Sequence, residues 1–299
     1  MKLSLIARER VFAGSLLVPC FLFVAFFALY PVAYSFFLSL HKIILGLPSL
    51  GHPFVGLKNY RALFQDQVAL HSLSNTLLFV FISTFFELLF GLIIALVINR
   101  HFRGRGLVRA AILVPWAIPT VVSSQMWRFI FNDKYGLVNF LLYGSNSSLY
   151  AAWLANPLTA FAAIVIADVW KTSSFTALII LAGLQLIPDE LYEAARIDGA
   201  SAWQQFKKIT LPLIKPSLLI ALLFRTMDAF RVFDLVFVMT QGGPGDSTNV
   251  LQFYGYKKIF AEGLMGYGST LSVLAFFITF VIALFYLKLI GTGLFQEKK

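Results

Sequence analysis

Charged side chains interrupt several apolar runs of this 299-residue chain, and each of these runs is long enough to cross a membrane. Carboxylates accept hydrogen bonds from hydroxyl groups, and guanidinium and ammonium groups donate to them, so such side chains are suited to bind a polar solute or to pair with one another. Because a charge at bilayer depth is costly, we expect them to face the interior of a helix bundle. The charged residues are Glu87, Arg128, Asp168, Lys171, Arg225, Asp228, Arg231 and Asp234. Arg128 is near the end of its run, so its long side chain is expected to reach the membrane surface.

Charges of alternating sign follow one another at steps of three residues in one of these runs, and they are Arg225, Asp228, Arg231 and Asp234. On a helix each step brings neighbours close enough to pair, so the run can enter a membrane nearly neutral. Three residues turn a helix by about 300°, which leaves the first and last charges about half a turn apart. We therefore expect some of these charges to line a pore and others to face neighbouring helices. A purely scaffolding ladder is the alternative.

The remaining charges invite similar predictions. Asp168 and Lys171 are three residues apart and share a helical face, where they are expected to pair with each other or to contact a bound solute. Glu87 is the only charge in its run, and it is expected either to contact the solute or to form a hydrogen bond or ion pair with another helix. The rings of Trp170 and Phe230 are expected to cover an apolar face of the solute.

Composition places the chain in a membrane. Hydrophobic residues make up 59% of it and charged residues 13%, against roughly a quarter charged in soluble domains. The net charge of +10 does not indicate nucleic-acid binding, because the basic residues gather between apolar runs and no separate basic soluble fold is present. Cys20 is the only cysteine, so the chain forms no internal disulfide.

The apolar runs predict an all-α polytopic membrane protein with six transmembrane helices in a single transmembrane domain over residues 1–299. The first run is too long for a secretory signal, and it is expected to be an uncleaved helix bent at Pro19 and Pro31. Pro115 and Pro119 predict that the third span is bent or partly unwound. The predicted spans cover residues of about 11–40, 72–98, 107–131, 158–186, 213–240 and 266–290.

Basic residues predict the orientation of the spans. Four arginines crowd the loop after the second span, and further basic residues flank the first span and end the chain. The segments assigned to the outside, 41–71, 132–157 and 241–265, carry fewer basic residues over a greater length. By the positive-inside rule, both termini and the polar stretch 188–212 are predicted to lie in the cytoplasm. The basic residues of the arginine-rich loop and of the two chain ends are Arg100, Arg103, Arg105, Arg109, Lys2, Arg8, Arg10, Lys298 and Lys299.

The polar stretch 188–212 predicts a helix, a bend and a second helix between the fourth and fifth spans. Pro188 and the acidic residues that follow it are typical of a helix start. Gly199 permits a bend that a side chain would oppose. Ser201 is placed to cap the second helix, and Pro212 is expected to end it.

In this stretch the chain resembles the permeases of binding-protein-dependent ABC importers, whose signature is Glu-Ala-Ala, a glycine, and then Ile-x-Leu-Pro. The matching residues are Glu193, Ala194, Ala195, Gly199, Ile209, Leu211 and Pro212. Residues 169–171, 224–234 and 242–245 resemble the branch that takes up maltose and trehalose. The resemblance assigns coupling to an ATPase to Glu193, Ala194, Ala195, Asp198, Gly199, Leu211 and Pro212.

The resemblance implies a multi-pass permease subunit in the cytoplasmic (inner) membrane of a prokaryote. It implies ATP-driven import of a disaccharide or oligosaccharide, such as trehalose or maltose, by alternating access. The expected partners are a homologous second permease subunit, two copies of an ABC ATPase subunit, an extracytoplasmic sugar-binding protein, the sugar and the lipid bilayer. No cofactor is expected on this chain, because ATP and magnesium belong to the ATPase subunits.

The chain lacks the motifs of an enzyme. It has no phosphate-binding loop of the Gly-x-x-x-x-Gly-Lys-Ser/Thr type, and its four histidines show no metal-ligand spacing. No metal site and no catalytic residue is predicted. The alternative to an importer subunit is a self-contained secondary transporter or intramembrane enzyme that uses the buried charges. The Glu-Ala-Ala stretch separates these classes, since only an importer subunit requires it.

Overall fold

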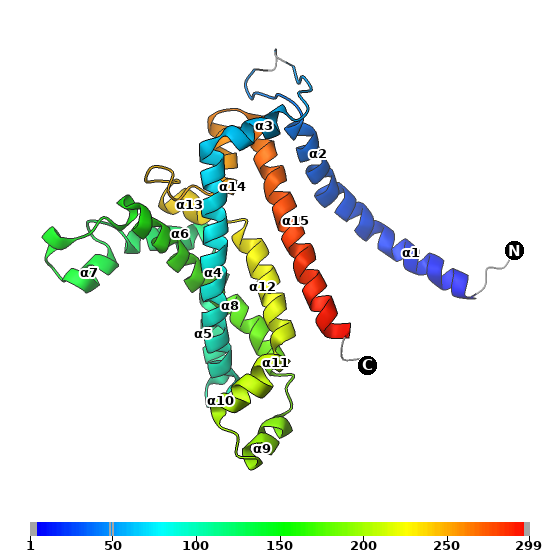
Figure 1. Cartoon of the computed structure of the whole chain (residues 1–299), viewed down its shortest axis with the longest axis vertical. Helices are drawn as coiled ribbons and strands as arrows, with labels where there is room; N and C mark the ends of the chain where they lie inside the picture. The colour runs from blue at the N-terminus through cyan, green and yellow to red at the C-terminus, as the bar shows by residue number, and fades with distance from the viewer. Residues whose placement is uncertain (1–4, 48, 50, 296–299) are drawn as a thin grey trace. The chain divides into compact units, whose positions relative to one another are not determined.

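The computed structural model describes residues 5–47, 49 and 51–295, and this part of the chain is helical and contains no β-strand (Figure 1). Lys2, Lys298 and Lys299, which the charge argument uses, lie outside the described residues. The α-helices are α1 (Leu5–Val24), α2 (Tyr30–Ser39), α3 (Lys58–Gln65), α4 (Gln67–Asn99), α5 (Arg105–Ala117), α6 (Thr120–Ile130), α7 (Leu137–Tyr143), α8 (Pro157–Leu184), α9 (Asp189–Ile197), α10 (Ala202–Gln205), α11 (Leu211–Leu213), α12 (Lys215–Ala229), α13 (Asp234–Met239), α14 (Leu251–Tyr256) and α15 (Met265–Phe295).

Long apolar helices confirm the prediction of a polytopic all-α protein. Four helical segments among the described residues are long and apolar enough to cross a membrane, namely Phe12–Ser39, α4, α8 and Met265–Leu289. Two further pairs of helices pass the same test together, and each is bent at a short break. The pair α5 and α6 is bent by 89°, and the pair formed by Ala202–Leu213 and α12 by 62°. If each bent pair is one span, the chain has six.

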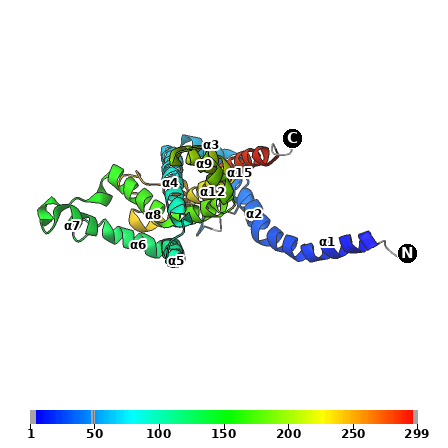
Figure 2. The same cartoon turned by 90° about the horizontal axis from the view of Figure 1, so that it is seen from below.

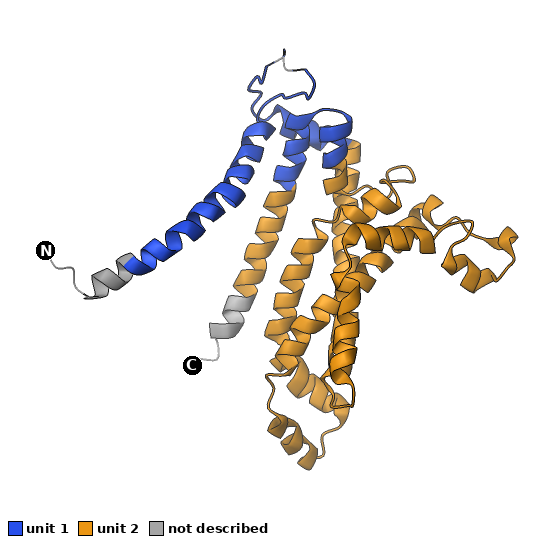
Figure 3. Ribbon diagram, turned by 180° about the vertical axis from the view of Figure 1, so that it is seen from behind, with its two compact units in different colours: residues 1–66, 255–274 blue, residues 67–254, 275–299 orange. Residues whose placement is uncertain are grey.

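The chain divides into two compact units (Figure 3). The described residues of 1–66 and 255–274 form the first. In this unit the segment after α2 is tied to α3, because the Asn59 side chain donates to the carbonyls of Ser39 and His41. The same segment pairs with the residues before α15 through a 2.7 Å hydrogen bond from the Leu45 amide to the Gly263 carbonyl.

The first apolar run contains a wide helical turn. A π-helix, η1 (Ala25–Leu29), separates α1 from α2, and Pro31 follows it in the first turn of α2. Proline lacks an N–H and its ring opposes the preceding helical turn, so a widened turn at this point relieves both problems. Pro19 lies inside α1.

The second unit contains the described residues of 67–254 and 275–299, and α4, α8 and α12 run side by side in it (Figure 1). Glycines permit their close approach. A Cβ atom on Gly91 of α4 would lie 2.6 Å from the Thr176 Cγ2 of α8, and one on Gly183 of α8 would collide with Ser217 of α12. The apolar core that these helices share is formed by Ala95, Ile98, Ala177, Ile180, Leu181, Leu184, Ile187, Ile214 and Ala221.

Two predicted spans are interrupted. The third breaks at Pro119, between α5 and α6, as the prolines predict. The fifth, predicted over 213–240, contains two helices, because α12 ends at Ala229 and α13 begins at Asp234. Irregular backbone at membrane depth is tolerated where it lines a cavity, and both breaks do so.

Candidate functional site

A buried ion pair joins α4 to α12. Arg225 binds Glu87 with two nitrogens: Nε donates to Oε2, and Nη2 donates to Oε1 at 2.8 Å. This fork geometry is the strongest arrangement of an arginine with a carboxylate. The prediction that Glu87 pairs with another helix is confirmed.

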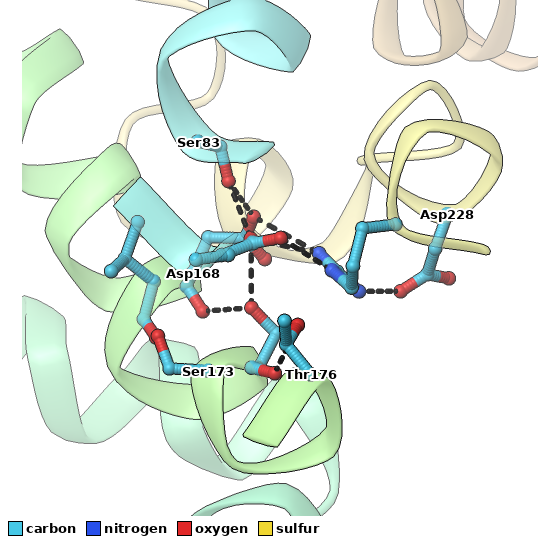
Figure 4. Close-up of polar contacts among 9 residues, drawn as sticks. Ser83, Asp168, Ser173, Thr176 and Asp228 are labelled. Atoms are coloured by element: carbon cyan, nitrogen blue, oxygen red, sulfur yellow. Dashed lines mark hydrogen bonds and ion pairs between the residues drawn. The ribbon is translucent and has the colours of Figure 1, made fainter. Parts of the chain in front are cut away.

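Helix α8 adds a second carboxylate to this pair (Figure 4). Asp168 Oδ2 lies 3.6 Å from Arg225 Nη2 and 2.5 Å from the Ser83 hydroxyl. Ser83 also lies 2.6 Å from Glu87 Oε1, and the Thr172 hydroxyl contacts the same oxygen at 2.8 Å. The carboxylates of two helices thus share one guanidinium and the Ser83 hydroxyl, and Thr172 provides a further donor to Glu87 alone.

The outer member of the network is Asp228, which Figure 4 places at the opposite end from Ser83. Arg225 Nη1 donates to Asp228 Oδ2 at 2.5 Å, so the predicted step of three residues forms an ion pair here. The side chain of Asp228 is nevertheless 63% exposed. It can therefore accept further hydrogen bonds from a solute.

Asp228 lines a cavity of about 440 Å³ together with Asp168, Lys171, Arg231 and Asp234. The volume is within the usual range of small-molecule sites, roughly 300–1,000 Å³. The break between α5 and α6 and the break after α12 supply most of the other lining residues, which are Trp116, Ala117, Ile118, Pro119, Thr120, Thr172, Ala229, Val232, Phe233 and Leu235. The cavity thus gathers charges of both signs from α8, α12 and α13.

Lys171 binds backbone in this structure. Its Nζ donates to the carbonyls of Trp116 at 3.1 Å and Ile118 at 2.5 Å, at the break between α5 and α6. Asp168 interacts with Ser83 and Arg225 on the other helices. Asp168 and Lys171 therefore do not pair with each other, although pairing was one of the two predicted outcomes; each binds partners on other segments.

The helical ladder of four charges is also wrong. Arg225 and Asp228 lie on α12, but Arg231 falls in the irregular segment after it and Asp234 opens α13. The amides of Arg231 and Val232 bond to carbonyls three residues back, and this tightening ends the helix. Arg231 and Asp234 reach the cavity because the helix breaks.

The two aromatic residues expected at the solute lie elsewhere. Phe230 is 1% exposed and does not line the charged cavity. Trp170 lines a separate apolar pocket between α4, α6 and α8, where its ring meets Trp127 edge-on at 5.7 Å. Neither ring covers a solute in the charged cavity in this conformation. Helical direction explains the place of Trp170, because neighbouring residues of a helix point in different directions and Trp170 faces the apolar pocket while Asp168 and Lys171 face the charged cavity.

At the other end of the unit, α9 and α10 form an elbow of residues 189–205, which Figure 1 draws beyond the ends of α8 and α12 and Figure 2 shows from below. Gly199 makes the turn with φ of +77°, a conformation that disfavours a side chain. Ser201 caps α10 in a reciprocal arrangement with Gln204, at 3.3 and 2.8 Å. The predicted bend and cap are both confirmed.

The signature residues of the elbow are accessible. Glu193, Ala194, Asp198 and Gly199 are exposed, and Ala195 is half-buried. Leu211 and Pro212 are also exposed, and the helix continues through Pro212 to Leu213 before it bends into α12. Pro212 therefore sits one residue before the end of the helix that it was expected to stop.

Several residues of these sites escaped sequence reasoning. Ser83 and Thr172 stand four residues from Glu87 and Asp168, and that spacing on one helical face is a signal that could have found them. Ile197 and Trp203 of the elbow are 87% and 69% exposed. These two residues could have been found from the sequence, because they are apolar residues inside a polar stretch. In the described ranges no group of three or more His, Cys, Asp or Glu side chains could hold a metal ion.

Comparison with known proteins gives consistent matches. Residues 87–295 match the family described as binding-protein-dependent transport system inner membrane component. The trehalose/maltose transport system permease protein MalF of Thermococcus litoralis is 43% identical over 281 residues, which are 94% of each chain. The trehalose transport system permease protein SugA of Mycobacterium tuberculosis is 40% identical over 286 residues, 95% of this chain and 90% of SugA.

The fold also occurs in a solved structure. A chain in the crystal structure of a bacterial ABC transporter involved in the import of the acidic polysaccharide alginate matches with a TM-score of 0.81. The match covers 95% of this chain and 96% of that chain, at 22% identity. At this identity the likeness concerns the fold.

Proposed function

Because the chain belongs to the family of inner-membrane components of binding-protein-dependent transport systems, we propose that it couples the ATPase of an ABC importer to sugar uptake by alternating access. The family consists of transport components, so the chain is a permease subunit and not an enzyme. We further propose that it pairs with a homologous second permease subunit, two ATPase subunits that bind ATP and magnesium, and an extracytoplasmic sugar-binding protein. The assembly would reside in the cytoplasmic (inner) membrane of a prokaryote.

The observation that carries the proposal is the elbow of residues 189–205. It combines an acidic helix start, small exposed Ala194, a glycine turn and a capped second helix. Small side chains permit close approach of a partner, and the exposed Ile197 offers an apolar anchor that a partner can bury. These features suit a knob that enters a cleft on an ATPase subunit.

The test of this docking role is a bulky residue at the glycine turn. Gly199→Leu should uncouple ATP hydrolysis from uptake or release the ATPase subunits, because leucine opposes the positive φ. Gly144→Leu is the matched control, since Gly144 also has a positive φ of +60° and open space around it but lies in the segment predicted to be outside. Coupled uptake and copurification of the ATPase at wild-type levels in Gly199→Leu would refute the proposal.

A charge at the apolar anchor gives a second readout of the same surface. Ile197→Asp should weaken copurification of the ATPase subunits, because it places a carboxylate in a contact that excludes water. Leu141→Asp is the control, since Leu141 is also well exposed and lies in the segment predicted to be outside. Equal copurification from both variants would contradict docking at Ile197.

We propose that the charged cavity forms this subunit's part of the sugar path. Its carboxylates can accept from sugar hydroxyl groups and its guanidinium group can donate to them. The relatives named for trehalose and maltose support a disaccharide or oligosaccharide of that class as the cargo. The alternative of a self-contained secondary transporter is not kept, because the chain belongs to a family of binding-protein-dependent transport components.

Two substitutions that each remove one charge test the cavity. Asp228→Asn and Arg231→Gln should each reduce trehalose uptake and trehalose-stimulated ATP hydrolysis while the complex still assembles. Loss of assembly would instead assign these residues to scaffolding. Unchanged uptake in both variants would refute their place in the sugar path.

A further inference from the structure

The break between α5 and α6 leaves backbone groups without helical partners inside a predicted membrane span. Helix α5 ends at Ala117, the chain turns by 89°, and α6 begins after Pro119. The last carbonyls of a helix have no partner within it, and a bilayer core offers no water to bind them. Donors for the break must therefore come from water in the cavity that it lines or from another part of the protein.

Lys171 supplies these donors from α8. Its ammonium group donates to the Trp116 and Ile118 carbonyls, which lie on either side of the end of α5, and the residue is only 7% exposed. One helical turn further along α8, the Phe175 ring stacks on the Trp116 ring with centroids 5.6 Å apart. Two contacts one turn apart thus fasten the break to α8.

The fastened segment is a wall of the charged cavity. Residues 116–120 line the cavity without a gap in the sequence, and Lys171 lines it beside them. An ammonium group has three N–H donors, and the two carbonyls leave one for the cavity. The position of this wall therefore depends on a side chain that belongs to another helix.

We propose that Lys171 is a positioning residue that holds the α5–α6 break against α8 and so sets the shape of the cavity. Its main effect on uptake is exerted through the wall, by keeping residues 116–120 in register with Asp228 and Arg231. The contacts alone support the role of Lys171 in holding residues 116–120, whereas its effect on sugar uptake rests on the proposed function. The two are tested separately.

The position of the wall is tested by thiol labelling in the assembled complex. Thr120→Cys, in a Cys20→Ser background, places a thiol at the start of α6, and its rate of reaction with a polar maleimide is measured. Adding Lys171→Met should change this rate by at least about fivefold, because the Trp116 and Ile118 carbonyls lose their donor. Lys171→Arg, which keeps N–H donors, should restore part of the difference. Lys215→Met is the matched control, since Lys215 is exposed at the start of α12.

The consequence for transport is tested with trehalose uptake at several concentrations. Lys171→Met should raise KM more than it lowers the maximal rate, with the amount of assembled complex unchanged, and Lys215→Met should alter neither. An unchanged labelling rate in Lys171→Met overturns the positioning role. A changed labelling rate with unchanged KM supports the positioning role and removes the cavity from the sugar path.

Discussion

The ion pair between Glu87 and Arg225 offers the sharpest test of what holds α4 and α12 together. In Glu87→Gln the shape of the side chain is kept, but Arg225 loses a bidentate carboxylate while it remains buried, at 2% exposed. Removing one partner of a buried ion pair costs about 3–5 kcal/mol. Arg225 keeps its 2.5 Å contact with Asp228, so we expect a loss near the lower bound, about 3 kcal/mol. This corresponds to roughly a hundredfold shift between packed and opened helices.

The assay is the fraction of the detergent-solubilised importer that remains assembled after heating. Glu262→Gln is the matched control, since Glu262 forms an exposed ion pair with Lys258 at 2.7 Å, and such pairs contribute about 0–1 kcal/mol. Replacing both buried partners, as in Glu87→Leu with Arg225→Met, should recover much of the loss, because no unpaired charge stays buried.

A small loss of stability in Glu87→Gln would refute this reasoning. Hydrogen bonds between transmembrane helices average only about 0.6 kcal/mol in double-mutant cycles. If Glu87→Gln were no less stable than Glu262→Gln, the pair would be an ordinary interhelical contact, and the glycine contacts would hold the bundle without it.

Three further outcomes follow from individual contacts. Gly91→Ala should destabilise the complex by about 1–3 kcal/mol, because its Cβ would lie 2.6 Å from the Thr176 side chain; Gly106→Ala, with open space around it, should not lower the thermal midpoint. Ser201→Ala should loosen the elbow by about 1 kcal/mol through loss of the cap, which faster amide exchange in α10 would show. Asn139→Ala should speed proteolysis between α6 and α8, since its buried side chain bonds backbone on both sides of α7; an unchanged cleavage rate would contradict that role.

Sequence by itself determined the features that depend on neighbouring residues. The six apolar runs, the bend at Pro119, the glycine turn at Gly199 and the cap at Ser201 all follow from local chemistry. Proline lacks a donor, glycine alone tolerates positive φ readily, and a serine hydroxyl can satisfy the amides of a helix start. These constraints act within a few residues, so they can be read along the chain.

Tertiary structure decided which charges meet. The sequence placed Glu87, Asp168 and Arg225 on separate runs without saying which would pair, and the close packing of α4, α8 and α12 at Gly91 and Gly183 settled the choice. Ion pairs between helices depend on the distance and rotation of each helix against the next, and helical spacing within one run does not contain that information. For the same reason Lys171 donates to carbonyls 53 and 55 residues away and does not pair with Asp168, its neighbour on the helix.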